Sequence, residues 1–82
     1  MTLEEFEAIQ EGDWCLVKLY HQGIQIVKYR FAIAGLRNRN LHSIITQNGE
    51  VTINEIHFKE HFGSFPELTF EEANIKFAEY LI

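Results

Sequence analysis

The sequence predicts a small α+β fold, in which a four-stranded antiparallel sheet lies between an N-terminal and a C-terminal helix. Three observations lead to this prediction. Residues 25–34 alternate between apolar and polar side chains with the period of a strand. Asn48-Gly49 is a dipeptide typical of a two-residue hairpin turn. Two capping boxes, one near each end of the sequence, indicate where the two helices begin.

The first capping box is Thr2-Leu3-Glu4-Glu5. The Thr2 hydroxyl can accept a hydrogen bond from the Glu5 amide, while the Glu5 carboxylate reaches back to the Thr2 amide. Gly12 then ends the apolar periodicity, because glycine is a poor helix residue. We predict a short helix over residues 3–10.

The next segment reads as a hairpin. Residues 14–20 are apolar on both faces, so one side of this strand should lie under a helix. His21-Gln22-Gly23 supplies a turn, and a second strand follows over residues 25–34. Lys28 and Arg30 point to one face of the second strand. The opposite face carries Val27, Tyr29, Phe31 and Ile33.

A second hairpin follows the connection over residues 35–40. Strands are predicted over residues 41–47 and 50–56, joined at Asn48-Gly49. A two-residue loop there sets Gln47 opposite Glu50, and counting outward places His42 opposite Glu55. Residues 56–62 suit either a short helix or an extended edge, so both alternatives stay open.

The C-terminal helix has the clearest pattern. Thr69-Phe70-Glu71-Glu72 is the second capping box, and the apolar residues that follow share one face. We predict a helix over residues 70–81. Its apolar face consists of Phe70, Ala73, Phe77, Tyr80 and Leu81.

These elements fit one domain, residues 1–82, because a chain of 82 residues has room for a single core. A small, strongly bent sheet that resembles an SH3-like barrel is the alternative to a flat meander. Gly12-Asp13 at the start of the first strand and the short hairpins are similar to that class.

The expected location is the cytoplasm. Cys15 is the only cysteine and lies in an apolar run, which indicates a small buried side chain in a reducing compartment. No apolar stretch approaches the ~20 residues that span a bilayer. The first residues are acidic, unlike the basic start of a signal peptide. We therefore expect no membrane partner.

Charge is divided unevenly along the chain, whose net charge is −5. Residues 13–47 hold five cations and one acid, a net charge of +4, and the rest holds two cations and eleven acids, a net charge of −9. The basic part is therefore the first hairpin and the connection after it. Its candidate partner-binding residues are Lys18, Lys28, Arg30, Arg37 and Arg39, with Trp14 and Tyr20 as aromatic neighbours.

Three interpretations of this basic region are open. Arginine and aromatic side chains together suit a protein interface. Basic residues beside aromatic rings also suit single-stranded nucleic acid, through phosphate pairing and stacking. In the third interpretation the acidic helices balance the hairpin charge, and Trp14 and Tyr20 belong to the core.

Catalytic and metal motifs are weak. His57 and His61 have helical metal-ligand spacing but lack a third ligand and the glutamate of the metalloprotease motif. His42 opposite Glu55 could pair a base with a carboxylate, but Ser43 has no nucleophile motif around it. We predict no enzyme, no cofactor and no metal.

The leading hypothesis is a non-enzymatic protein-interaction module, either an adaptor or an inhibitor of a larger protein. A nucleic-acid-binding protein that uses the basic first hairpin and the following loop is the alternative. Phage, plasmid or defence genes nearby would favour the inhibitor. A symmetric homodimer is a further expectation, because Trp14, Leu16 and Tyr20 could form a bare apolar face.

Overall fold

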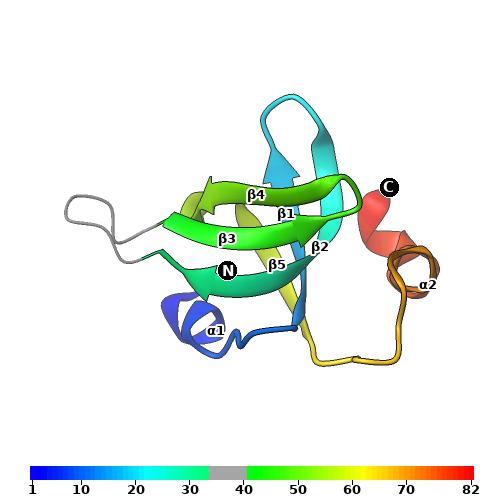
Figure 1. Ribbon diagram of the computed structural model, residues 1–82, viewed down its shortest axis with the longest axis horizontal. Helices are drawn as coiled ribbons and strands as arrows, with labels where there is room; N and C mark the ends of the chain where they lie inside the picture. Colours follow the sequence, from blue (N-terminus) through cyan, green and yellow to red (C-terminus); the bar gives the residue numbers. More distant parts are fainter. Residues whose placement is uncertain (34–40) are drawn as a thin grey trace.

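The computed structural model describes residues 1–33 and 41–82 and has an α+β fold (Figure 1). Its strands form one antiparallel sheet in the order β4-β3-β2-β1-β5. This confirms the predicted class and the antiparallel sheet. The strands are β1 (Trp14–Leu19), β2 (Gly23–Ala32), β3 (Leu41–Thr46), β4 (Gly49–Asn54) and β5 (Phe58–Gly63).

The prediction of four strands is wrong, because the segment left open forms both a turn and a strand. A 3₁₀ turn, η1 (Glu55–His57), comes directly after β4, and β5 follows it. The Asn54 side chain begins η1 by accepting a hydrogen bond from the Ile56 amide at 3.1 Å. β5 then pairs with β1, more than 40 residues earlier, so the five strands are not a simple meander.

The register of the second hairpin also differs from the prediction. Thr46 faces Gly49, so the turn is made by Gln47 and Asn48 rather than by Asn48-Gly49. In this hairpin Gly49, just after the turn, takes a positive φ of 125°, which a glycine adopts at little cost. His42 consequently faces Ile53, and the predicted pair with Glu55 is wrong. A slip of two residues leaves every side chain on its predicted face.

A register shift in β2 redirects one side chain. It lies between Tyr29 and Phe31, where β2 pairs with β3. Val27 and Tyr29 are buried as predicted, whereas Phe31 is exposed. The single alternating face predicted for β2 therefore ends at Tyr29, because an extra residue in a strand reverses the facing of the residues after it.

Both capping boxes are present, and both helices are shorter than predicted. They are α1 (Leu3–Glu7) and α2 (Phe70–Lys76), and a 3₁₀ turn, η2 (Ala78–Leu81), follows α2. α2 ends at Phe77, whose backbone leaves the helical region (φ −107°, ψ 24°) and whose ring stacks on Phe62 of β5 with centroids 4.0 Å apart. Within residues 1–33 and 41–82, no helix is long and apolar enough to span a membrane.

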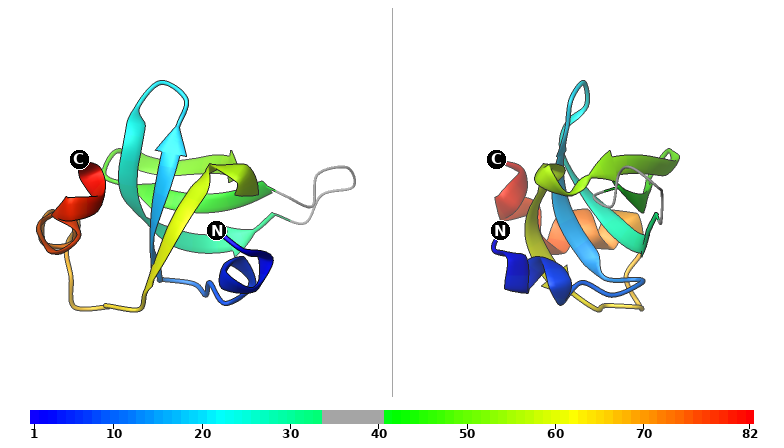
Figure 2. Two further views of the ribbon diagram at one scale, coloured as in Figure 1. Left: turned by 180° about the vertical axis from the view of Figure 1, so that it is seen from behind. Right: turned by 90° about the vertical axis from the view of Figure 1, so that its left-hand side faces the viewer.

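Two apolar clusters lie on opposite faces of the sheet, one beside α1 and one beside α2 (Figures 1 and 2). The α1-side cluster consists of Ile9, Cys15, Val17, Leu19, Val27, Tyr29, Ile44, Ile53 and Phe58, with Phe6 packed against it. The α2-side cluster is centred on Trp14, Leu16, Ile26, Ala73 and Phe77. Burial of both faces of β1 confirms that a helix covers one side of it.

Candidate partner-binding site

A shallow surface pocket of about 420 Å³ lies where the turn of the β1–β2 hairpin meets η1. The antiparallel pairing of β1 with β5 places η1 beside the last residues of β1, because η1 directly precedes β5. The Nδ1–H of His57 donates to the Lys18 carbonyl oxygen at 3.0 Å and so ties the turn to the strand. We call this pocket and its rim the η1 surface. Its residues are Lys18, Leu19, Tyr20, Ile56, His57 and Lys59.

Two large apolar side chains of the η1 surface are exposed. Tyr20 is 88% exposed and Ile56 is 70% exposed. The Tyr20 ring meets His57 edge-on and His21 at a tilt, with ring centroids 5.9 and 6.1 Å apart. Leu19, by contrast, is buried and belongs to the α1-side cluster. Exposed aromatic and aliphatic side chains around a pocket are typical of an interaction surface.

The η1 surface also holds two lysines with no acidic neighbour in hydrogen-bond range among the described residues. Lys18 and Lys59 are exposed and take part in none of the ion pairs of residues 1–33 and 41–82. The other described cations are engaged elsewhere in the molecule. Lys76, for example, lies over the ring of Phe65 at 5.1 Å. Among the described lysines and arginines, the two that have neither an acidic nor an aromatic partner therefore line the η1 surface together.

The structure does not bring all the predicted residues into one face. Trp14 is fully buried in the α2-side cluster, where its indole N–H donates to the Phe65 carbonyl oxygen at 3.1 Å. The Lys28 ammonium lies over the Trp14 ring, 4.9 Å from its centroid. Because Trp14 faces Lys28 across the hairpin, both sit at the end of β1 remote from Tyr20. Neither can contribute to the η1 surface.

Arg30 is likewise separate from Lys18 and Tyr20. Arg30 forms an ion pair with Glu50 of β4 and lies beside the Phe31 ring. Arg37 and Arg39 lie outside the described residues. Of the five predicted partner-binding residues that the structure describes, Lys18 and Tyr20 are the two that line the η1 surface.

A second pocket, of about 340 Å³, adjoins the first and shares Ile56 and Lys59 with it. Ile56 thus stands between two hollows, one toward Tyr20 and one toward α1. The second hollow is also lined by Met1, Thr2, Phe6, Glu55 and Phe58. It has an acid where the first has Lys18, so the two hollows differ in charge.

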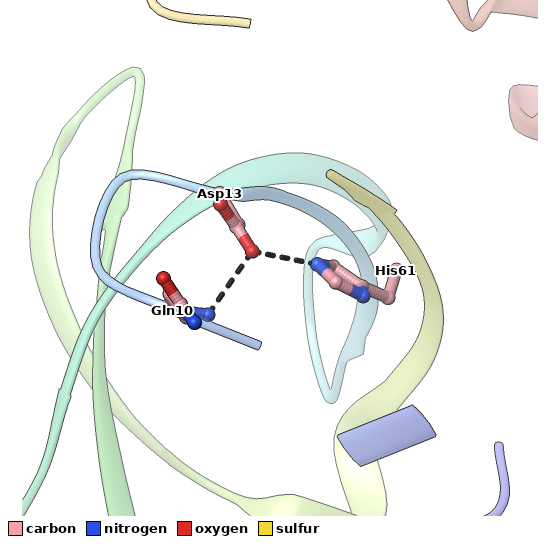
Figure 3. Close-up of polar contacts among 3 residues, drawn as sticks. All are labelled: Gln10, Asp13 and His61. Carbon is pink, nitrogen blue, oxygen red and sulfur yellow. Dashed lines mark hydrogen bonds and ion pairs between the residues drawn. The ribbon is translucent and has the colours of Figure 1, made fainter. Parts of the chain in front are cut away.

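Asp13 and His61 form the closest histidine–carboxylate pair among the described residues, and Figure 3 shows it. His61 Nε2 lies 2.7 Å from Asp13 Oδ2, which also accepts from the Gln10 amide at 3.0 Å. Both side chains are largely buried. This contact joins the segment after α1 to β5, so it holds two parts of the fold together.

His57 and His61, whose spacing is that of helical metal ligands, each bond to another group of the protein. His57 is bonded to the Lys18 carbonyl and His61 to Asp13. Residues 1–33 and 41–82 contain no cluster of three or more side chains able to hold a metal ion. His61 thus acts in this structure as a partner of Asp13.

Two further polar groups are buried in the α1-side cluster. The Tyr29 hydroxyl and His42 Nδ1 lie 2.9 Å apart, and the His42 ring meets Phe6 and Phe58 edge-on. Burial lowers the pKa of His42, although the nearby Glu55 charge opposes this shift, and burial raises the pKa of Tyr29. The neutral forms of both side chains are therefore favoured.

Cys15 is buried beside these residues, as the sequence predicted. Burial, aided by the nearby Asp13 charge, raises the pKa of its thiol to about 12. A thiol of this kind is almost entirely protonated at neutral pH and is a poor nucleophile.

Comparison with known proteins finds no matching family model, no matching curated protein and no matching solved structure. The geometry of the η1 surface is therefore the basis for proposing a function.

Sequence patterns missed half of this surface. Ile56, His57 and Lys59 fall in the segment whose structure was left open between helix and strand. Asn54 was the available signal, because asparagine commonly begins a helical turn by capping it. A turn after Asn54 would have ended the fourth strand early and exposed the residues that follow.

Proposed function

We propose that this protein is a small, non-enzymatic protein-interaction module, an adaptor or an inhibitor of a larger protein, whose partner docks on the η1 surface. One observation carries the proposal: Tyr20 and Ile56 are 88% and 70% exposed at the rim of one pocket. Leaving a tyrosine and an isoleucine in water forgoes burial worth about 1.5–3 kcal/mol for a side chain of this size. A partner that covers both recovers this free energy.

We also propose that the sheet is an SH3-like barrel. The strand order β4-β3-β2-β1-β5, the register shift within β2 and the 3₁₀ turn between β4 and β5 support this assignment. The fold class does not itself identify a function, since one fold carries many. It does explain why η1 and the β1–β2 turn lie together at one end of the sheet.

The test uses two isoleucines of nearly equal exposure. Ile56 is 70% exposed on η1 and Ile75 is 72% exposed on α2. A partner is first identified by affinity capture from the native host and purified, and its affinity for each variant is then measured by calorimetry. We expect Ile56→Ser to weaken binding roughly fivefold or more, as truncation of a central interface residue does, and Ile75→Ser to leave it unchanged.

Three outcomes would contradict the proposal. Recovery of no stoichiometric partner under mild salt would overturn the interaction module itself. Equal affinity of the Ile56→Ser variant and the wild type would overturn the choice of surface. So would a loss of binding confined to the Ile75→Ser variant. Both substitutions replace exposed side chains, so the stability of each variant should stay within about 0.5 kcal/mol of the wild type.

Binding of single-stranded nucleic acid is the second candidate. Tyr20 beside Lys18 and Lys59 offers a ring for base stacking next to two positive charges, which supports it. The net charge of −5 counts against it, because most nucleic-acid modules are basic overall. This candidate predicts oligonucleotide binding that weakens steeply with added salt and that Arg37→Glu with Arg39→Glu also weakens.

The reason given for a homodimer no longer applies. Trp14 and Leu16 are buried by the α2-side cluster, so the apolar face that a second copy was expected to cover is already covered within the chain. Of the three residues in that argument, Tyr20 is the one that remains exposed.

A further inference from the structure

We infer that the η1 surface recognises an acidic linear segment of its partner, one in which carboxylates flank a large apolar side chain. This inference rests on the proposed function, since it specifies the ligand of the same surface. Its basis is the juxtaposition of two uncompensated lysines with an apolar pocket. Lys18 and Lys59 stand at the rim of the pocket that also has Tyr20 and Ile56 around it.

The other described lysines and the described arginine each contact an aromatic or an acidic side chain. The Lys28 ammonium lies over Trp14, and Arg30 is paired with Glu50. Lys76 lies over Phe65 and Phe77. Among the described lysine and arginine side chains, the two without such a contact are therefore Lys18 and Lys59 at the η1 surface. On a chain with a net charge of −5, this small positive area should attract an acidic ligand selectively.

Ile56 stands between the two adjoining hollows. The hollow beside Tyr20 has Lys18 at its rim, whereas the hollow beside Phe6 has Glu55. Lys59 borders both. An extended segment that crosses Ile56 can place one apolar side chain on each side of it. Its acidic residues should then gather over Lys18 and Lys59, and the end over Glu55 should carry no acid.

Short synthetic peptides are suitable probes because the natural partner is not needed. The first peptide is Asp-Glu-Leu-Asp-Glu followed by Gly-Leu-Gly, and the second replaces each acid by its amide, Asn or Gln. Both are titrated into the full ¹⁵N-labelled chain while backbone amide shifts are followed. We expect the acidic peptide to shift the amides of Leu19, Tyr20, Ile56 and Lys59, and to bind at least about fivefold more tightly than its amide counterpart.

Charge-reversal variants test the role of the lysines. Lys18→Glu combined with Lys59→Glu should weaken the acidic peptide roughly tenfold or more, since two attractions become two repulsions. Lys18→Arg combined with Lys59→Arg keeps the charge and should retain binding. Lys76→Glu reverses a single charge on α2, half the change made by the double variant, and should have less than a twofold effect. The amide spectrum of each variant reports whether it is folded.

Several results would overturn the inference. They are equal binding of the acidic and amide peptides, peptide shifts that map away from η1, and an affinity that the double reversal leaves unchanged. If a thymidine oligonucleotide shifted the same amides and bound more tightly than the acidic peptide, the ligand of the η1 surface would be nucleic acid and not an acidic peptide. Failure here is distinguishable from failure of the proposed function. A captured partner whose affinity depends on Ile56 but not on the two lysines would leave the module intact and remove only its acidic ligand.

Discussion

The two ends of the β1–β2 hairpin carry similar residues and have opposite environments. At one end Lys28 lies over Trp14, which α2 and the loop before it cover completely. At the other end Lys18 and Tyr20 project into water beside η1. Both ends present an aromatic ring and a lysine. The first pair is part of the core and the second forms a surface.

The difference shows that strand periodicity assigns a residue to a face but does not tell how much of that face is covered. α2 and η2 together span only residues 70–81, so they reach one end of the hairpin and leave the turn bare. Figure 2 shows the β1–β2 turn projecting beyond the rest of the sheet, away from both helices. A free lysine and an exposed ring are thus a consequence of where the helical cover ends.

The largest effect should come from removing the ring at the covered end. Trp14→Ala should lower the free energy of unfolding by about 3–5 kcal/mol, because it empties the centre of the α2-side cluster. Tyr20→Ala should change it by less than about 0.5 kcal/mol. Urea unfolding followed by circular dichroism measures both, since the variant lacks the only tryptophan.

Scaling by chain length gives a total stability of about 4–12 kcal/mol, so Trp14→Ala should leave a marginal or unfolded chain. A loss below about 1 kcal/mol for Trp14→Ala, or above it for Tyr20→Ala, would contradict the contrast between the two ends. Trp14→Phe is the milder variant that keeps the comparison measurable if the alanine variant does not fold.

Much of the fold could be predicted because it depends on local signals. The two capping boxes and the strand pattern of β1 and β2 act over two to five positions, and the structure contains both capping boxes and the pattern as far as Tyr29. β5 could not be predicted in the same way. Its partner, β1, lies more than 40 residues away, and its own pattern from Phe58 to Phe62 is equally compatible with a helix.

The next largest effect is the pH dependence of stability that comes from His42, which is buried against Tyr29. Burial lowers the pKa of His42, so the folded state binds its proton more weakly than the unfolded state does. The associated stability is fully present above the ordinary histidine pKa of about 6.5 and is lost as the pH falls from there through the folded pKa. Urea midpoints between pH 8 and pH 5 measure this loss.

His42→Gln removes the titration and leaves an amide that can bond to the Tyr29 hydroxyl, so its stability should fall less steeply below pH 6.5. The matched control is His21→Gln, because His21 is exposed in the turn at the other end of the hairpin. It should show the same acid dependence as the wild type. If the stability of His42→Gln and of the wild type fell in parallel with pH, His42 would not be the source of the loss of stability in acid.

The candidate site was only partly predictable, for a related reason. Lys18 and Tyr20 were identified from composition near a turn, whereas Ile56 and Lys59 reach them through the pairing of β1 with β5. Trp14 with Lys28 and Tyr20 with Lys18 each combine an aromatic residue with a lysine, and no local pattern separates the two pairs. Their roles are decided by α2, which the chain adds more than 40 residues later.

The smallest effect on stability should come from removing the charge of Lys28 or of Lys18, the lysines at the two ends of the hairpin. Lys28→Met keeps an apolar stem against the core but removes the charge over Trp14, and should cost about 0.5–1 kcal/mol. Lys18→Met, which loses no such contact, should stay within about 0.5 kcal/mol of the wild type. A double-mutant cycle with Trp14→Phe assigns the cause, because phenylalanine attracts a cation less strongly than tryptophan does. The cost of Lys28→Met should shrink in the Trp14→Phe background. A cost that persists there in full would mean that Lys28 stabilises the fold through its stem, and that a lysine at either end of the hairpin could serve a partner equally well.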